Sequence, residues 1–154
     1  MQIRRYSLPG YFLFFIIITC FSIQLSGCSK LPVEHETVTP SDGKIILSVN
    51  KVNDGKVHFF TYKKSGKRIN FFVRTDGKGN LSAYFDACYT CYKNKKGYRV
   101  EGTDLICNEC NLKFRLADEI WENKDCCPIM LRSQLENKDL IIETSSLEKG
   151  ARLF

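Results

Sequence analysis

The sequence predicts a mainly β protein: a small antiparallel β-rich domain with a zinc-ribbon-like double CxxC subdomain, preceded by a signal peptide helix. Three observations lead to this prediction. Short stretches rich in Phe, Val, Tyr and Ile are separated by Gly-containing turns, a pattern typical of antiparallel strands. Two CxxC pairs are separated by fifteen residues, which favours paired metal knuckles. An apolar N-terminal stretch ends in Leu-Ser-Gly-Cys, as in exported proteins.

Four strands are expected before the first CxxC pair. Each is followed by turn-forming residues or by a change in residue composition. They cover residues 44–50, 56–63, 68–75 and 81–85. Turn residues such as Asp-Gly and Ser-Gly separate them, which indicates an antiparallel meander. Aromatic and β-branched side chains on these strands are expected to supply much of the core: Phe59, Tyr62, Phe71, Phe72, Val73, Tyr84 and Phe85.

The second half of the chain predicts shorter elements around the cysteines. Residues 97–101 and 105–107 indicate a hairpin between the two CxxC turns, and residues 111–116 a further short strand. Residues 117–123 suggest a helical turn. Residues 140–144 form the last predicted strand, and the tail beyond them is expected to be frayed.

The N-terminus has the layout of a lipoprotein signal. Arg4 and Arg5 precede an apolar stretch, and the segment Leu25-Ser26-Gly27-Cys28 resembles the lipobox of bacterial lipoproteins. The apolar run of about 11–14 residues is short of the ~20 needed to span a bilayer. We therefore expect residues 1–27 to be a signal peptide and Cys28 to carry acyl chains such as palmitate. An uncleaved anchor or ordinary secretion is the alternative.

This reading divides the chain into a signal peptide, a tether over residues 28–42 and a folded domain over residues 43–148. Several acyl chains on one residue give stable membrane attachment. The expected location is the cell envelope, with the protein lipid-anchored on the extracytoplasmic side of a membrane.

The charge balance points away from nucleic acid as a partner. Residues 1–27 hold two of the 23 basic and none of the 17 acidic residues, so the remainder carries a net charge of +4. The densest basic group lies between the CxxC pairs: Lys93, Lys95, Lys96 and Arg99. A solvated loop explains such a group better than a nucleic-acid patch.

The strongest chemical signal is the set of four cysteines Cys88, Cys91, Cys107 and Cys110. Four thiolates can bind zinc or another thiophilic metal ion, or an iron–sulfur cluster. Structural or exchanging disulfides are a third use, because exported proteins meet an oxidising environment. Covalent haem attachment is excluded at the motif level, because Tyr92 and Asn111 stand where that motif needs histidine.

Two further cysteines and one histidine complete the candidates. Cys126 and Cys127 precede Pro128, and one of them is a candidate fifth ligand, replaceable ligand or resolving thiol. Packing as small hydrophobic side chains is the plain alternative for both. His58 lies within an apolar strand, where it is either an edge histidine or a ligand or proton shuttle. No role is assigned to His35.

The motifs together resemble the family of membrane iron–sulfur-containing FtrD-like proteins over about residues 40–132. The resemblance rests on these segments: Asp54-Gly55-Lys56-Val57-His58-Phe59-Phe60, Asn70-Phe71-Phe72-Val73, Phe85-Asp86-Ala87-Cys88-Tyr89-Thr90-Cys91, Lys96-Gly97-Tyr98, Cys107-Asn108-Glu109-Cys110 and Cys126-Cys127-Pro128. It implies five metal-ligand positions: Cys88, Cys91, Cys107, Cys110 and Cys126. Cys127 and His58 are additional candidates.

The resemblance also implies a role in iron uptake. Some members of the family are multi-spanning membrane proteins linked to ferrous iron uptake, in which this domain helps to move electrons. This chain has a lipid-anchor signal where those members have a transmembrane bundle. We therefore expect an accessory protein with an iron or iron–sulfur centre, or zinc as the alternative, whose partner is an iron permease or a redox protein.

Two other functions stay open from the sequence. The first is a binding module whose zinc or disulfides are purely structural. The second is a thiol–disulfide enzyme that uses Cys126 and Cys127. No residue is assigned a catalytic role, and whether the protein is an enzyme is left undecided, with a metal-binding or electron-transfer accessory role favoured.

Overall fold

The computed structural model describes residues 33–118 and 126–154, which belong to one compact unit. The predicted signal peptide and the lipidation candidate Cys28 lie outside the described residues, as do residues 119–123 of the expected helical turn. Within the described ranges, no helix is long and apolar enough to cross a membrane.

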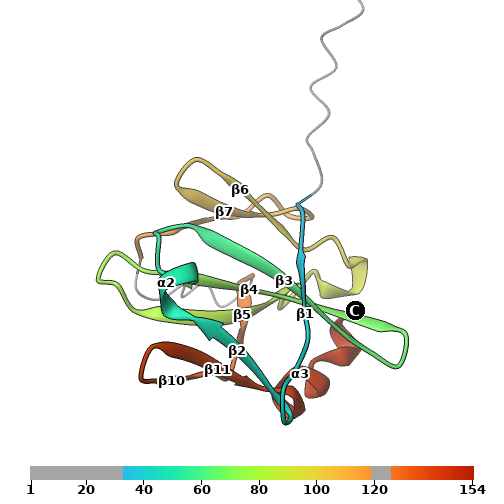
Figure 1. The fold of residues 1–154 in the computed structure, drawn as a ribbon. Coiled ribbons are helices and arrows are strands. Elements are labelled where there is room, and N and C mark those ends of the chain that lie inside the picture. Colours follow the sequence, from blue (N-terminus) through green and yellow to red (C-terminus); the bar gives the residue numbers. More distant parts are fainter. Residues whose placement is uncertain (1–32, 119–125) are drawn as a thin grey trace, which may run out of the picture. The chain divides into compact units, whose positions relative to one another are not determined.

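Three β-sheets make up the fold (Figure 1). The central sheet has the strand order β1 (Glu36–Val38), β3 (Val57–Lys64), β4 (Lys67–Thr75), β5 (Leu81–Cys88) and β9 (Pro128–Leu131). A second sheet, here the β2 sheet, has the order β10 (Gln134–Glu136), β11 (Asp139–Glu143) and β2 (Lys44–Ser48). A third, here the knuckle sheet, has the order β6 (Tyr98–Glu101), β7 (Asp104–Cys107) and β8 (Lys113–Arg115).

All strand pairs are antiparallel except β1 with β3, which run parallel. Short helical segments connect or follow the strands: α2 (Val49–Val52), η1 (Tyr92–Asn94), α3 (Thr144–Lys149) and η2 (Ala151–Leu153). The prediction of a mainly β, antiparallel fold is confirmed. The predicted meander corresponds to β3, β4 and β5, which pair in sequence order.

The central sheet lies between the other two, because its alternating side chains enter two separate cores (Figure 1). Phe71 and Val73 point to the core shared with the β2 sheet, where they meet buried residues such as Ile142. Phe72 and Tyr84, on the opposite face, enter the core shared with the knuckle sheet. This second core also contains cysteines, so the sheet alternation itself positions the candidate site.

The predicted core agrees with the structure except at one position. Six of the seven expected side chains are buried, whereas Phe59 is only partly buried. Phe59 lies on β3 beside the three-residue strand β1, which leaves part of that face uncovered. The first predicted strand also ends earlier than expected, since the chain enters α2 at Val49.

A buried arginine fastens the loop that follows the knuckle sheet. Arg74 on β4 is 1% exposed, and its guanidinium donates hydrogen bonds to the carbonyl oxygens of Leu116 at 2.7 Å and Asp118 at 2.6 Å. The same guanidinium lies 5.9 Å from the centre of the Tyr84 ring. A buried cation at this place satisfies carbonyl groups that would otherwise lack donors.

Both ends of the described domain are more ordered than the sequence suggests. The stretch expected to be a tether contains β1, which pairs with β3. The tail expected to be frayed is instead α3 followed by η2, so that expectation is wrong. Leu147 and Leu153 from these helices are buried in the core shared with the β2 sheet. Two apolar residues in a polar segment are a weak helical signal, and tertiary packing decides the outcome.

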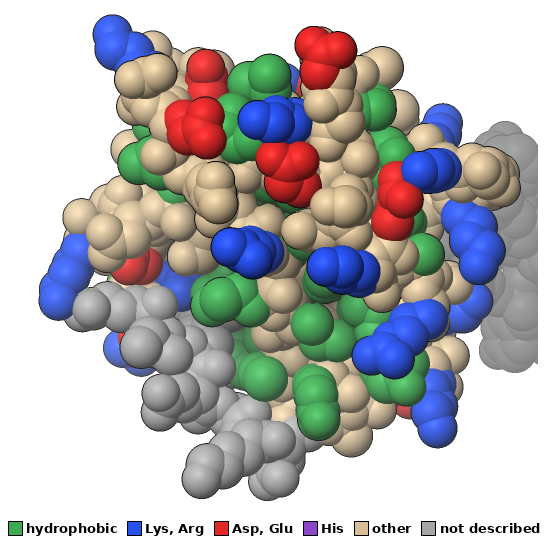
Figure 2. All heavy atoms as spheres, turned by 90° about the horizontal axis from the view of Figure 1, so that it is seen from below, with side chains coloured by type: hydrophobic (Ala, Val, Ile, Leu, Met, Phe, Trp, Pro, Cys, Tyr) green, Lys and Arg blue, Asp and Glu red, His purple; other side chains and the backbone are tan. Residues whose placement is uncertain are grey.

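The surface of the domain mixes charge types. Figure 2 shows acidic and basic side chains on the same face, with hydrophobic side chains exposed among them. In the β2 sheet, the most exposed large apolar side chains are those of Ile46 (52% exposed) and Leu135 (62% exposed). Single exposed apolar residues of this kind are common on soluble domains and indicate no site by themselves.

Because Leu147 in α3 is buried, we expect the C-terminal helix α3 to stabilise the domain. Leu147→Ala should lower the free energy of unfolding by about 2–5 kcal/mol, because it removes a buried side chain and leaves a cavity. The matched change Leu135→Ala, at an exposed position, should stay within about 0.5 kcal/mol. Chemical denaturation followed by circular dichroism measures both. Equal stability of the two variants would show that the tail does not belong to the core.

Candidate metal centre

The first cysteine knuckle, the turn from Cys88 to Cys91, continues directly from the buried strand β5. Cys88 is the last residue of β5 and is 3% exposed. Cys91 follows in a turn and precedes η1, where the amide of Asn94 donates to the Cys91 carbonyl oxygen at 3.0 Å. Lys95 and Gly97 have φ angles of 52° and 61°. Both angles lie in the left-handed region, which glycine adopts without steric cost and other residues adopt rarely. The chain thereby turns from the central sheet into β6.

The second knuckle, the turn from Cys107 to Cys110, repeats this arrangement on the knuckle sheet. Cys107 ends β7 and is 1% exposed, whereas Cys110 lies in an exposed turn. The amide of Asn111 donates to the carbonyl oxygen of Cys107 at 3.0 Å and closes the turn. Asn111 has a φ of 58°, which asparagine tolerates better than most residues. The chain then enters β8.

A third segment brings Cys126 to the two knuckles. Cys126 is 4% exposed and lies two residues before β9, which pairs with β5. The amide of Tyr89, inside the first knuckle, donates to the Cys127 carbonyl oxygen at 2.9 Å. This bond fixes the cysteine pair beside the first knuckle.

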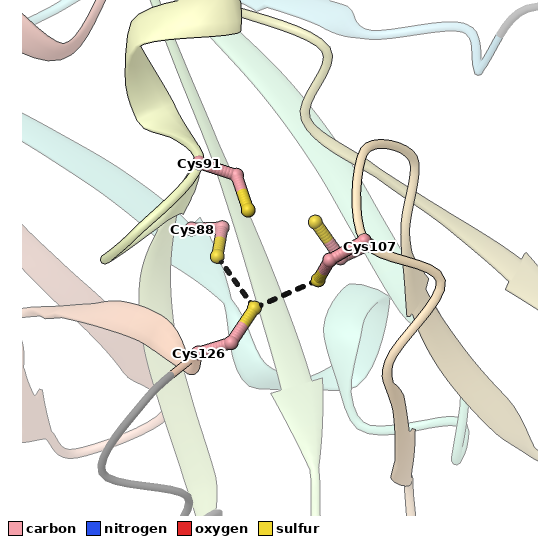
Figure 3. A group of neighbouring side chains, drawn as sticks. Cys88, Cys91, Cys107 and Cys126 are labelled. Atoms are coloured by element: carbon pink, nitrogen blue, oxygen red, sulfur yellow. Dashed lines mark hydrogen bonds between the residues drawn. The ribbon is translucent and has the colours of Figure 1, made fainter.

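Five sulfurs converge at the seam between the central sheet and the knuckle sheet. The Sγ atoms of Cys88, Cys91, Cys107, Cys110 and Cys126 all lie within 4.8 Å of one another. The Cys126 sulfur lies 2.8 Å from that of Cys88 and 2.9 Å from that of Cys110. Figure 3 shows the labelled side chains pointing from three backbone segments toward a common centre.

Two of the further candidates are not part of this group. Cys127 is half-buried, and its sulfur is not among the converging ligand atoms. His58 lies on β3, and its Nε2 is 2.7 Å from the Asp54 carboxylate. The arrangement of His58 matches the edge-histidine interpretation, and the structure does not bring it to the sulfurs.

The thiols differ in acidity because they differ in burial and hydrogen bonding. Burial raises the pKa of Cys88 and Cys110, but hydrogen bonds from Cys126 and backbone amides outweigh it. The result is a pKa below the ordinary value for both thiols, and about 7 for Cys110. Burial and then neighbouring sulfurs raise the pKa of Cys91, Cys107 and Cys126. The Cys126 sulfur thus lies between two sulfurs whose pKa is lowered.

Asp86 connects β5 to β6 through a hydrogen bond to the backbone. Its buried carboxylate accepts a hydrogen bond from the amide of Tyr98 at 2.7 Å and lies 2.9 Å from His35 Nε2. A Cβ at Gly97 would lie 2.5 Å from the same carboxylate, so a glycine is needed there. Since Asp86 belongs to β5 and Tyr98 to β6, the carboxylate joins the sheets that carry the cysteines.

Sequence reasoning missed both partners of this contact. A carboxylate inside an apolar strand, two residues before a cysteine, is a signal that would have identified Asp86. His35 gave no such signal, because it lies in a polar segment with no periodicity. Its Nδ1 lies 3.1 Å from the Val33 carbonyl oxygen. Both ring nitrogens therefore lie within hydrogen-bonding distance of oxygen atoms.

The basic group between the knuckles is partly neutralised by acidic neighbours. Lys96 pairs with Glu109 at 2.6 Å, and Arg99 pairs with Glu101 at 2.8 Å. Asn94 also donates to Glu109 at 2.9 Å, so Glu109 links the surfaces of the two knuckles. These pairs agree with a solvated loop, and exposed ion pairs of this kind add little stability.

The sulfur set suits a thiophilic metal centre on its chemistry and spacing. Every converging donor is a cysteine, and soft thiolates select zinc, iron–sulfur and related centres over hard cations. A metal–sulfur bond of about 2.3 Å puts tetrahedral sulfurs about 3.8 Å apart, within the spread of this group. Five sulfurs exceed the four that a tetrahedral ion needs, so in such a site one donor would be replaceable or would bridge.

The comparison with known proteins agrees with the motifs on which the site is built. A family model described as membrane iron-sulfur containing protein FtrD-like matches residues 52–154, which includes all five converging cysteines. No curated protein matches the chain significantly. The matched region covers most of the described domain, from the end of α2 to the last residue. The chain therefore belongs to the family of membrane iron–sulfur-containing FtrD-like proteins.

Proposed function

We propose that the protein is an envelope lipoprotein that holds a cysteine-ligated metal or iron–sulfur centre and serves iron transport or electron transfer. The ligands are Cys88, Cys91, Cys107, Cys110 and Cys126. The convergence of their five sulfurs within 4.8 Å carries this proposal. The family, which is named for membrane association and iron–sulfur content, supports iron over other thiophilic metals.

Exposure at one edge of the sulfur group supports exchange with a partner. Cys110 is exposed, whereas Cys88, Cys107 and Cys126 are buried. A lowered pKa of about 7 leaves a large fraction of Cys110 as thiolate near neutral pH. An exposed thiolate offers incoming metal its first ligand, and the buried thiols complete the site. The same edge brings a redox partner nearest to the centre.

The proposed anchor would keep this centre near a membrane partner. His35 is the seventh residue after the lipidation candidate Cys28, and a fully extended chain spans at most about 25 Å over seven residue steps. His35 contacts Asp86, two residues before Cys88. An acylated Cys28 would therefore restrict the cysteine centre to the vicinity of the bilayer, which suits an iron permease or membrane redox protein as partner.

A structural zinc site is the second candidate function. It is favoured by one observation: the converging cysteines come from β5, β7 and the segment before β9, so that a metal ion would join two sheets. A metal ion that bridges separate elements contributes its binding energy to folding. In that case the protein would be a binding module, with no change of oxidation state at the centre.

Metal analysis of the full-length protein, purified in detergent under anaerobic conditions, separates these functions. We expect stoichiometric iron with visible absorption from thiolate-to-iron charge transfer. Acid-labile sulfide identifies a cluster, and its absence identifies a single ion. Colourless protein with stoichiometric zinc supports the structural function. Protein without metal and with fully oxidised thiols contradicts both.

The two adjacent cysteines allow a matched test of the ligand set. Cys126→Ser should weaken metal binding by more than about tenfold, because its sulfur lies among the five converging donors. Cys127→Ser changes the neighbouring residue in the same way but should leave metal affinity unchanged. Competition with a chromogenic chelator measures both. Equal losses in the two variants would contradict the assigned ligand set.

Asp86→Asn tests the link between the knuckles. The change removes the negative charge beside His35 and weakens the acceptor for the Tyr98 amide. We expect metal affinity to fall about 10–100-fold, as for other groups that orient ligands. Asp76→Asn is the control, because Asp76 accepts hydrogen bonds from Lys78 and Asn80 in its own exposed turn. An unchanged affinity of Asp86→Asn in the chelator competition would contradict this role.

A further inference from the structure

The hydroxyl group of Tyr98 is buried beside the cysteines, and the described part of the chain offers it no hydrogen-bond partner. Tyr98 is 1% exposed. Within residues 33–118 and 126–154, its hydroxyl makes no hydrogen bond of normal geometry. A buried hydroxyl without a partner costs folding energy, so its presence in a well-packed core needs a reason. A phenylalanine would fill the same space without that cost.

The surroundings of this hydroxyl are sulfurs. Tyr98 packs in the same buried cluster as Cys88, Cys107 and Cys126, and it is the strand partner of Cys107 across β6 and β7. Burial raises the pKa of Tyr98 above its ordinary value, and the neighbouring Cys88 sulfur adds to the rise. A tyrosine hydroxyl has an ordinary pKa of about 10, so at neutral pH it holds its proton and is a hydrogen-bond donor.

The position of the Tyr98 ring is fixed from three sides. The backbone amide of Tyr98 donates to Asp86 at 2.7 Å. The ring packs edge-on against Phe72, at 5.9 Å between ring centres, and against Phe114 at 6.1 Å. A ring held this firmly cannot turn its hydroxyl toward solvent, so the donor is preorganised toward the sulfur group.

We propose that the Tyr98 hydroxyl donates a hydrogen bond to the Cys88 sulfur when that sulfur is a metal-bound thiolate, and that this bond sets the reduction potential of the centre. The inference rests on the proposed function, because it requires metal on the cysteines. No covalent bond forms or breaks: the proton stays on the tyrosine oxygen, and the electron enters or leaves the metal. Tyr98 is in this sense a positioning and tuning residue, not a ligand.

The direction of the effect follows from electrostatics. A hydrogen bond to a thiolate withdraws electron density from sulfur and stabilises the more negative, reduced state of the centre. Removing the bond should therefore lower the reduction potential. We expect the loss of this hydrogen bond to change the reduction equilibrium about tenfold. This change corresponds to about 59 mV for one electron.

Tyr98→Phe is the test, in full-length detergent-purified protein reduced and loaded anaerobically with ferrous iron. Potentiometric titration should give a potential about 59 mV lower than that of the unmodified protein. A second readout uses Co²⁺, whose thiolate charge-transfer band should move to lower energy in Tyr98→Phe. Tyr62→Phe is the matched control, because it removes a buried-ring hydroxyl that bonds to Glu148 in the other core. Its potential and band should not change.

Stability separates tuning from packing. The metal-free Tyr98→Phe protein should be as stable as the unmodified protein or more stable, because the lost hydroxyl has no partner there. Unchanged potential and cobalt band in a loaded Tyr98→Phe protein would overturn this inference alone. Failure of the unmodified protein to bind either metal would overturn both this inference and the proposed function.

Discussion

Five cysteine sulfurs lie within 4.8 Å of one another at the seam between two β-sheets, and the rest of the site depends on this close approach. Thiolates at such distances repel one another, and protonated thiols gain little from their mutual hydrogen bonds. A thiophilic cation removes the repulsion and replaces the protons. The shifted acidities agree with this, since hydrogen bonds lower the pKa of Cys88 and Cys110, whereas burial and the neighbouring sulfurs raise the pKa of Cys126 between them.

The surrounding structure explains how the sulfurs are brought together. The central sheet carries one core on each of its faces, and among residues 33–118 and 126–154 the buried cysteines belong to the core shared with the knuckle sheet. Asp86 joins β5 to β6 through the Tyr98 amide, and Tyr89 joins the first knuckle to the segment of Cys126. Hydrogen bonds from the backbone amides of Tyr89 and Tyr98 thus help to hold the segments that carry the cysteines. Metal binding would add a further link across the seam.

The meander and the hairpin were predictable from local patterns, because alternating apolar residues and Gly-containing turns specify strands without reference to distant contacts. The four knuckle cysteines were predictable from spacing for the same reason. The resemblance to the FtrD-like family added Cys126 to them. The partnership of Asp86 with His35 was not predictable, since 51 residues separate them. The helical tail was missed because Leu147 is buried by tertiary packing, which a short polar segment does not reveal.

X-ray absorption spectroscopy at the metal edge tests the central claim most directly, because it reports the atoms bound to the metal without reference to any variant. The sample is the full-length protein purified in detergent under anaerobic conditions, with its native metal. The account predicts a first coordination shell made of sulfur at about 2.3 Å. A shell made only of nitrogen and oxygen would contradict a metal centre formed by the converging cysteines.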